Sequence, residues 1–411
     1  MQTALRSLIS GYIGGGWGKQ APDKTHVVPS SVIRGTDLDA VQSGQIEGVP
    51  QRYHTESNVR SRTLSPGDIV FEVSGGSKDQ PVGRSILLNA QRLGAFDSKV
   101  IPASFCKKIT PDHRRINARF LHAHLQLAWA DRRIVQWQVQ STGISNFNFE
   151  SFLDDFIIDL PPLGVQRRIA GILSAYDELM ENSQRRIRLL EAMARALYRE
   201  WFVHFRFPGH DTKSSASDNS PDFVSGMLGD LCGLTKDTYD DAVHSELPLL
   251  DLAHMPSRTL APQDTGHPSE LTTSRIVFKK NDTLFGAIRC YLHKVVAAHY
   301  SGVTNTSVLV LRPKRPCFRS LLAIIASDAE TIRWAEAQST GTKMPVINWG
   351  IFQKMPAPVP SAGLAQEFEN IAGPMLDQIG VHAIQIQNLR RTRDLLLPRL
   401  LSGQVQIPNT N

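Results

Sequence analysis

The chain has 411 residues, of which 41% are hydrophobic and 20% charged, and its formal net charge is +6. This apolar content supports packed cores and excludes an intrinsically disordered chain. The sequence contains no run of about 18 apolar residues, which argues against a membrane-spanning helix, and its modest basic excess suits a polyanionic partner.

The four cysteines indicate a reducing compartment and no zinc site. They are Cys106, Cys232, Cys290 and Cys317, and no two stand at a spacing typical of metal ligands. Residues 1–13 lack the apolar centre of a secretory signal. The expectation is therefore a cytoplasmic protein without a metal centre.

The first globular region opens with a glycine-rich stretch, residues 11–19. It does not fit a phosphate-binding loop, because Ile13 and Gln20 occupy positions that require glycine and serine or threonine. No βαβ pattern surrounds it, so a dinucleotide fingerprint is excluded as well. We expect a flexible turn that exposes Trp17. Short apolar runs then predict strands at 26–28, 69–73 and 85–88, and a helix is expected at about 117–138.

The most regular stretch of the chain is a predicted helix at residues 163–205. Large apolar residues recur at steps of three and four, with one gap of eight residues centred on Ser183. This spacing predicts a heptad seam interrupted by a four-residue stutter, and about 40 residues make a helix of roughly 60 Å. A narrow seam on so long a helix requires a partner helix. The predicted seam consists of Ile169, Ile172, Tyr176, Leu179, Ile187, Leu190, Ala194, Leu197 and Trp201.

A second globular region and a second helix follow a polar linker. Residues 207–224 are rich in Ser, Asp and Pro, as linkers are. Strands are predicted at 276–278, 283–288, 294–298 and 307–312, and a helix at 320–337. The second long helix spans residues 364–401, and Pro374 within it should start or kink it. Its predicted seam consists of Phe368, Ile371, Met375, Ile379, Ile386, Leu389, Leu396 and Leu400.

The two halves of the chain repeat one another. Gln-Ser-Thr-Gly occurs at 140–143 and again at 338–341, each time before a long helix. Pro162 and Pro360 are separated by the same number of residues as the two tetrapeptides. Gln166 and Gln366 are separated by two residues more. A repeat this long predicts a duplicated module, a globular region followed by a long helix.

With these motifs in this order, the sequence resembles the specificity subunit of a type I DNA restriction-modification system, and the resemblance covers essentially the whole chain. It rests on Ser-Thr-Gly at 141–143 with Asn146 and Gln166, and on the same tripeptide at 339–341 with Asn348 and Gln366. The stretches 67–70 and 281–286 are also similar to that family.

The resemblance implies a mixed α/β (α+β) fold with two globular target-recognition domains. Two long helices would join these domains as an antiparallel coiled coil, with a pseudo-two-fold internal repeat. The predicted borders are 1–160 for the first domain, 161–206 for the central helix, 207–224 for the linker, 225–358 for the second domain and 359–406 for the C-terminal helix.

The resemblance also implies a DNA reader without chemistry of its own. Each globular domain would read one half of a bipartite target, and the helices would set the spacer between the halves. The expected partners are double-stranded DNA, two modification (methyltransferase) subunits and restriction/translocase subunits, with no membrane. No cofactor is expected in this chain, because S-adenosylmethionine, ATP and magnesium would belong to the partner subunits.

The predicted DNA-contacting residues are cationic or amide side chains in turns near the repeated Ser-Thr-Gly loops. Arginine and lysine can hold phosphates or guanine edges, and asparagine can pair with adenine. Gly143 and Gly341 would let the backbone come close to the DNA. In the alternative, these loops simply connect a helix to the last strand of each domain. The other candidates are Arg84, Ser145, Asn146, Asn148, Arg289, His293, Lys294, Lys343 and Asn348.

Two other functions remain possible from the sequence. The chain could be a coiled-coil interaction scaffold that does not bind DNA, or a stand-alone nuclease or ATPase. The second alternative lacks sequence support: neither an (Asn/Asp)-Pro-Pro-Tyr methyltransferase motif nor a Walker pair is present. Pro-Asp at 111–112 and at 221–222 is not followed by the acid-x-Lys pattern of nucleases.

Overall fold

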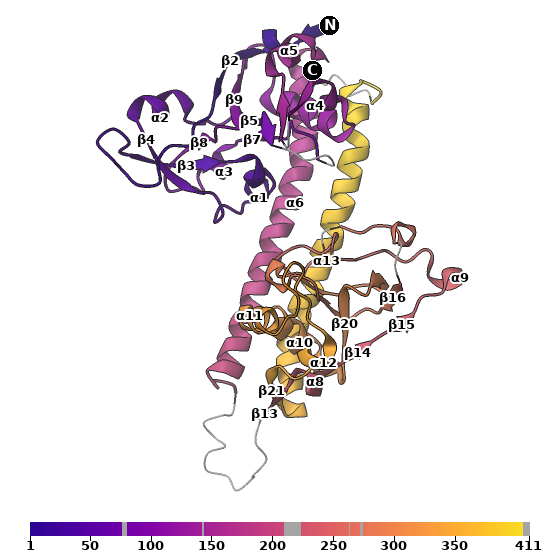
Figure 1. Cartoon of the computed structure of the whole chain (residues 1–411). Coiled ribbons are helices and arrows are strands. Elements are labelled where there is room, and N and C mark those ends of the chain that lie inside the picture. Colours follow the sequence, from indigo (N-terminus) through magenta and orange to yellow (C-terminus); the bar gives the residue numbers. More distant parts are fainter. Residues whose placement is uncertain (76–79, 142–143, 209–222, 263, 272–273, 406–411) are drawn as a thin grey trace. The chain divides into compact units, whose positions relative to one another are not determined.

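The computed structural model divides the chain into two compact units. Unit 1 combines Met1–Glu181 with Arg390–Asn411, and unit 2 is Asn182–Leu389. The division runs through both long helices, α6 (Leu163–Tyr198) and α13 (Ala362–Leu401) (Figure 1). The structure describes residues 1–75, 80–141, 144–208, 223–262, 264–271 and 274–405.

The core of unit 1 is built on a four-stranded antiparallel sheet in the order β2-β9-β5-β7. The strand β5 (Ile-Val-Phe-Glu) is buried along its whole length because it lies inside the sheet. Phe71 on β5 packs against Phe147, Phe149 and Phe152 with ring centroids 5.1–5.6 Å apart. The strands are β2 (Ile9–Gly14), β9 (Cys106–Pro111), β5 (Ile69–Glu72) and β7 (Ser85–Leu87).

Three smaller sheets and several helices complete unit 1. The order β4-β3-β8 contains β4 (Gln51–His54), β3 (Val28–Ile33) and β8 (Lys99–Pro102). The order β10-β11-β6 contains β10 (Gln138–Ser141), β11 (Ile144–Phe147) and β6 (Ser74–Gly75), and β1 (Gln2–Ala4) pairs with β12 (Ile157–Asp159). The helices are η1 (Leu5–Leu8), η2 (Gly35–Asp37), α1 (Leu38–Gln42), α2 (Glu56–Arg62), α3 (Ala90–Leu93), α4 (Ala118–Ala130), η3 (Arg133–Trp137) and α5 (Phe149–Asp155).

Unit 2 contains a four-stranded antiparallel sheet of the same kind, in the order β14-β20-β17-β18. Its strands are β14 (Cys232–Thr235), β20 (Val308–Pro313), β17 (Thr283–Gly286) and β18 (Val295–Ala297). The other strands are β13 (Phe223–Met227), which pairs with β21 (Pro356–Pro360), and the sheet of β15 (Asp237–Thr238), β16 (Arg275–Phe278) and β19 (Gly302–Asn305). The helices are η4 (Arg199–Val203), α8 (Leu228–Leu231), α9 (Asp241–His244), η5 (Pro268–Glu270), η6 (Cys290–Leu292), η7 (Pro316–Phe318), α10 (Arg319–Ala326), α11 (Ala329–Ala337) and α12 (Trp349–Phe352).

The repeat between the two units extends beyond the similarity of their sequences. In each unit the turn before the buried central strand ends in an aspartate, Asp68 before β5 and Asp282 before β17. Each aspartate carboxylate accepts a hydrogen bond from a backbone N–H three residues earlier, at 2.7 Å from Ser65 and 2.8 Å from Lys279. Both turns therefore use the same side-chain hydrogen bond to start the central strand.

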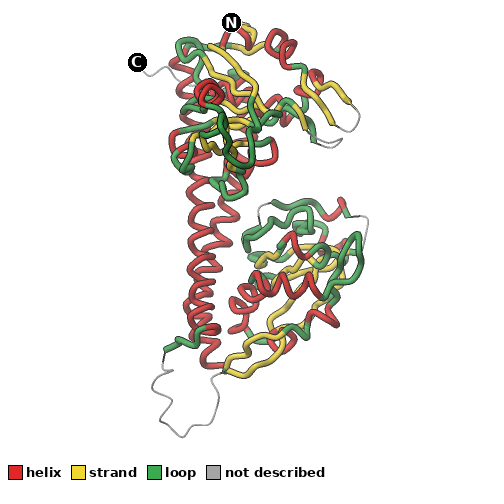
Figure 2. The backbone as a smooth tube through the Cα atoms, turned by 60° about the vertical axis from the view of Figure 1, so that its left-hand side comes forward, coloured by secondary structure: helices red, strands yellow, loops and turns green. Residues whose placement is uncertain are grey.

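The long helices form close to where the sequence predicts them, and both run without interruption (Figure 2). The helix α6 ends at Tyr198 and continues into the π-helical turn η4. The expectation that Pro374 starts the second helix is wrong, because α13 begins upstream of it at Ala362. Pro374 lies on an exposed position of that helix.

The predicted seam of α6 is wrong in its first half, and so is the stutter. Ile172 and Leu179 are exposed, whereas Leu173 and Met180 are buried. Ser183 is also buried, and its hydroxyl lies 3.4 Å from the amide oxygen of Gln385. The inward face, which consists of buried and half-buried positions, follows regular heptad spacing through residues 169, 173, 176, 180, 183, 187, 190, 194, 197 and 201.

The seam of α13 needs a similar correction. Ile371 is 42% exposed, while Ala365, Ala372 and Ala383 are buried. The predicted seam contained only large apolar residues and therefore omitted these alanines. Alanine suits positions where two helices approach closely. The other predicted positions on α13 are buried or half-buried.

Four shorter predictions also change. The helix expected at 117–138 ends at Ala130, and the one expected at 320–337 is divided into α10 and α11 at Ser327-Asp328. The strand expected at 26–28 begins only at Val28. The glycine-rich stretch is not simply a turn, because Ile9–Gly14 forms strand β2. Within the described part of the chain, no helix has the length and apolar character needed to cross a membrane.

Candidate nucleic-acid interface

Arg84, a predicted DNA contact in unit 1, is committed to a neighbour inside the unit. Its guanidinium donates to both carboxylate oxygens of Glu72, at 2.9 and 3.1 Å. These hydrogen bonds raise the pKa of Arg84, and only 14% of its side chain is exposed. The Arg84 side chain therefore links β7 to β5 inside the unit.

Ser145 and Asn146 lie on β11, next to β6. The buried hydroxyl of Ser145 accepts a hydrogen bond of 2.9 Å from the side-chain amide of Gln138. Asn146 is exposed, and its amide oxygen accepts a hydrogen bond of 2.8 Å from the Ser74 hydroxyl. Gly143 lies outside the described residues.

His293 and Lys294 of unit 2 both bond to backbone carbonyls of their own unit. The His293 ring nitrogen Nε2 lies 2.8 Å from the Ser327 carbonyl oxygen, and burial lowers the pKa of this histidine. The Lys294 ammonium donates to the Leu252 carbonyl oxygen, and burial lowers its pKa as well.

Arg84 and Lys294 occupy equivalent positions in the two units. The Arg84 carbonyl accepts from the Glu72 N–H at the end of β5, and the Lys294 carbonyl accepts from the Gly286 N–H at the end of β17, both at 2.9 Å. The cation that precedes β7 or β18 thus has the same backbone role and an internal side-chain partner in each unit.

Arg289, Gly341 and Lys343 come together in one exposed loop cluster of unit 2. The backbone N–H of Arg289 donates to the Pro345 carbonyl at 2.8 Å, and Val346 bridges to both Ile288 and Thr340. Gly341 has a φ of +103°, which favours glycine. Arg289 and Lys343 are exposed, and no carboxylate of the described residues pairs with either cation. This cluster therefore exposes two cations on the surface of unit 2.

Asn148 and Asn348 begin two equivalent short helices. The amide oxygen of Asn148 accepts from the Ser151 N–H at 3.3 Å and caps α5. The amide oxygen of Asn348 accepts from the Ile351 N–H at 3.0 Å and caps α12. Both amide oxygens have a local structural role, which is a common role for asparagine at this position.

Three polar groups of α6, none of them among the predicted DNA-contacting residues, join the globular parts to the long helices. Gln166 of α6 is buried, accepts from the Asn117 N–H at 2.9 Å and donates to the Pro161 carbonyl at 2.8 Å. Glu191 of α6 is also buried in unit 2. In unit 1, Asp177 of α6 accepts from Arg119 at 2.6 Å and from Arg393 of α13 at 3.0 Å. In the sequence of a charged helix, an acidic residue that becomes buried cannot be distinguished from one that stays in solvent.

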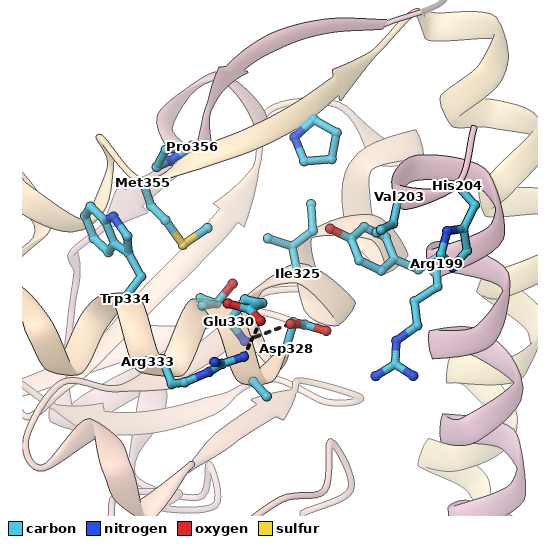
Figure 3. Close-up of a pocket in the computed structure, with 14 residues that line it drawn as sticks. Arg199, Val203, His204, Ile325, Asp328, Glu330, Arg333, Trp334, Met355 and Pro356 are labelled. Atoms are coloured by element: carbon cyan, nitrogen blue, oxygen red, sulfur yellow. Dashed lines mark hydrogen bonds and ion pairs between the residues drawn. The ribbon is translucent and has the colours of Figure 1, made fainter.

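Unit 2 contains a hollow of about 520 Å³ (Figure 3). Tyr198, Asp328 and Trp334 are among its lining residues. Burial raises the pKa of Tyr198 to about 12, so its phenol stays protonated, and the Asp328 carboxylate caps α11 by accepting from the Glu330 N–H at 2.9 Å. Across the described residues, no group of three or more His, Cys, Asp or Glu side chains is arranged to hold a metal ion.

Comparisons with known proteins bear on the resemblance to type I specificity subunits. Residues 67–192 match the family model described as "Type I restriction modification DNA specificity domain". The Type I restriction enzyme MjaIX specificity subunit of Methanocaldococcus jannaschii is 21% identical over 280 residues, which are 62% of this chain and 62% of that protein. The match thus spans less than two thirds of that relative.

A solved structure has the same fold. The crystal structure of the type I restriction-modification system S subunit from M. genitalium gives a TM-score of 0.57 at 15% identity, with 100% of this chain and 96% of that chain covered. The resemblance to type I restriction-modification specificity subunits is therefore confirmed by the family model and by the curated relative.

Proposed function

We propose that this chain is the DNA-specificity subunit of a cytoplasmic type I restriction-modification complex. It reads a bipartite target and directs adenine methylation and cleavage by partner subunits. The observation that carries the proposal is the duplicated sheet, β2-β9-β5-β7 in unit 1 and β14-β20-β17-β18 in unit 2. Two related domains with different surface residues suit two different half-sites.

The proposed DNA contacts are chosen from the predicted residues whose side chains are exposed. Arg289 and Lys343 in unit 2 are exposed cations, and Asn146 in unit 1 has an exposed amide. Arg84, His293 and Lys294 act as supports, because each is bonded inside its own unit. We assign phosphate or base contacts to the first group and loop positioning to the second.

The two long helices have the second role in the proposal, that of a spacer. A helix of 40 residues such as α13 is about 60 Å long, and half-sites on one face of DNA lie about 34 Å apart per turn. Helices of this length can set a fixed spacing of one or two turns between the half-sites. We propose that they pair as an antiparallel coiled coil with a pseudo-two-fold repeat.

The outer faces of the helices suit protein partners. Leu189 and Met193 of α6 are 58% and 54% exposed, and Val381 and Leu395 of α13 are 55% and 58% exposed. Exposed apolar residues that recur on a helix are typical of protein interfaces. We assign them to two modification subunits, which would carry S-adenosylmethionine, while restriction subunits would supply ATP- and magnesium-dependent steps.

A DNA-binding titration of the purified complex tests this proposal. The chain bound to its modification subunit should bind target-containing DNA selectively, with an affinity that falls as salt rises because phosphate contacts release counterions. The chain alone should neither methylate nor cleave DNA. Salt-insensitive or absent DNA binding by the complex would favour a coiled-coil scaffold instead, and ATP- or metal-dependent turnover by the chain alone would favour a nuclease or ATPase.

A further inference from the structure

The glycine-rich segment 14–19 is tied to three strands of unit 1. The Gly15 N–H donates to the Cys106 carbonyl of β9, and the Gly16 N–H donates to the Pro102 carbonyl of β8, both at 2.9 Å. Lys19 exchanges two backbone hydrogen bonds of 2.9 Å with Tyr53 of β4. The segment is therefore held on both sides of Trp17.

Two glycines make this path possible. A Cβ atom on Gly15 would lie 2.1 Å from the Ala103 carbonyl oxygen, where no side chain fits. Gly18 has a φ of +68°, and a Cβ atom there would lie 2.5 Å from the Tyr53 carbonyl oxygen. Only glycine fits these positions, so the backbone carries Trp17 at a fixed place on the surface.

Trp17 is partnered by a cation and remains accessible. Its side chain is 40% exposed, and the Arg52 guanidinium carbon lies 4.6 Å from the centre of the indole ring. Such a cation–aromatic contact holds both side chains in place while leaving part of the ring open.

A second arginine adds positive charge to the glycine-rich segment. Arg62 of α2 donates to the Gly14 carbonyl at 2.9 Å and to the Asn58 amide oxygen at 2.8 Å. Among the described residues no carboxylate lies within ion-pair distance of Arg52 or Arg62, whereas neighbouring Lys19 is paired with Asp23. The two guanidiniums therefore carry uncompensated charge, that of Arg52 over the indole ring and that of Arg62 against the backbone of Gly14.

We propose that Trp17 and Arg52 form a DNA contact of unit 1. The indole packs against a sugar of the DNA backbone, and the guanidiniums of Arg52 and Arg62 bind phosphates. Stacked aromatics beside cations are a common means of holding nucleic acid, whereas an apolar protein partner would leave the two charges unmatched. The contact rests on the proposed function, and it lies outside residues 67–192 and outside the residues that the sequence predicted.

DNA-binding titrations of the chain with its modification subunit test the contact. The variants are W17A, W17F, R52Q and, as a control, F105A, which removes another exposed aromatic ring of the same unit. We expect W17A to weaken binding roughly tenfold, W17F to retain most of the affinity, and F105A to bind as the wild type does. R52Q should lower the dependence of log K on log salt by about one unit.

Three results would overturn the proposed contact. The first is an unchanged affinity and salt slope for both W17A and R52Q. The second is a loss of assembly with the modification subunit at unchanged DNA affinity, which would assign the surface to a protein partner. In the third, the wild-type complex itself fails to bind DNA, and then the proposed function fails together with the contact.

Discussion

The carboxylate of Asp282 accepts two hydrogen bonds of 2.8 Å from the guanidinium of Arg312. Asp282 precedes β17, and Arg312 lies on the neighbouring strand β20. Unit 1 has the same arrangement: the Asp68 carboxylate before β5 lies 3.1 Å from the Lys108 ammonium on β9. An acid–base pair between turn and strand is thus kept in both copies although the cation differs.

Removal of this acid should destabilise unit 2. Asp282 is 2% exposed, so D282A removes two hydrogen bonds of Arg312, which keeps only Asp237 as a partner, and leaves the Lys279 N–H without its acceptor. The variant should lower the free energy of unfolding by about 3 kcal/mol. Chemical denaturation measures this change. The matched control is D241A, which removes an exposed partner of Arg275 and should cost less than about 0.5 kcal/mol. Similar losses for both variants would contradict the role given to Asp282.

Glu191 should make unit 2 less stable as pH rises. Its carboxylate accepts from the Thr259 hydroxyl at 2.6 Å and from the Leu260 N–H at 2.7 Å, and burial raises its pKa. Because the pKa of the Glu191 carboxyl is higher in the folded state than in the unfolded state, its contribution to stability is complete at a pH below the unfolded-state pKa. That contribution is lost as the pH rises through the folded-state pKa.

The variant E191Q tests this titration. It keeps an oxygen that can accept both hydrogen bonds but cannot ionise, so the fall in stability with rising pH should be smaller than in the wild type. Urea unfolding between pH 4.5 and 8 measures both slopes. E178Q is the control, because Glu178 is an exposed acid on the same helix. Equal slopes for wild type and E191Q would exclude Glu191 as the titrating group.

Three histidines, one buried and two half-buried, should make the chain sensitive to acid. Burial lowers the pKa of His122 to about 3, and those of His124 and His299 to about 4. A depressed folded pKa gives stability that is present above the unfolded value of about 6.5 and is lost as pH falls toward the folded value.

The acid sensitivity can be assigned to one residue at a time. Each histidine should contribute a loss of about 2 kcal/mol between pH 6.5 and 5, at about 1.4 kcal/mol per pH unit. H122Q should remove one such contribution from the pH dependence of unfolding, while H113Q, at an exposed position, should leave it unchanged. The assignment is wrong if H122Q retains the full acid dependence.

The exposed apolar positions of α6 should be needed for assembly. L189E combined with M193E places two charges where an apolar partner surface is proposed, so co-purification with the modification subunit should fall at least tenfold. The control N182E introduces the same side chain at an exposed polar position of α6. Undiminished assembly of the double variant would move the modification-subunit interface elsewhere.

Sequence reasoning was sufficient for the elements that repeat over many residues. The two long helices and the strands β5, β7, β16, β17, β18 and β20 form at or near the predicted places, since each has a strong apolar pattern. The predicted seam of α6 was wrong because Ser183 is polar and yet buried. A seam defined by apolar residues alone is interrupted at this position.

The candidate interface was harder to predict because side-chain partners come from distant parts of the chain. Glu72 for Arg84 and Ser327 for His293 become neighbours only after folding. The same holds for Trp17, whose glycine-rich loop was recognised while its partner Arg52 was not. Composition identifies a cation, whereas only the fold shows whether a carboxylate already neutralises it.

Methylome sequencing tests the central claim most directly. A host that expresses this chain with its neighbouring modification subunit should carry adenine methylation at a bipartite, asymmetric motif with a fixed spacer. Deletion of the chain should abolish that motif. Methylation that persists at the same motif after the deletion would contradict the assignment of DNA specificity to this chain.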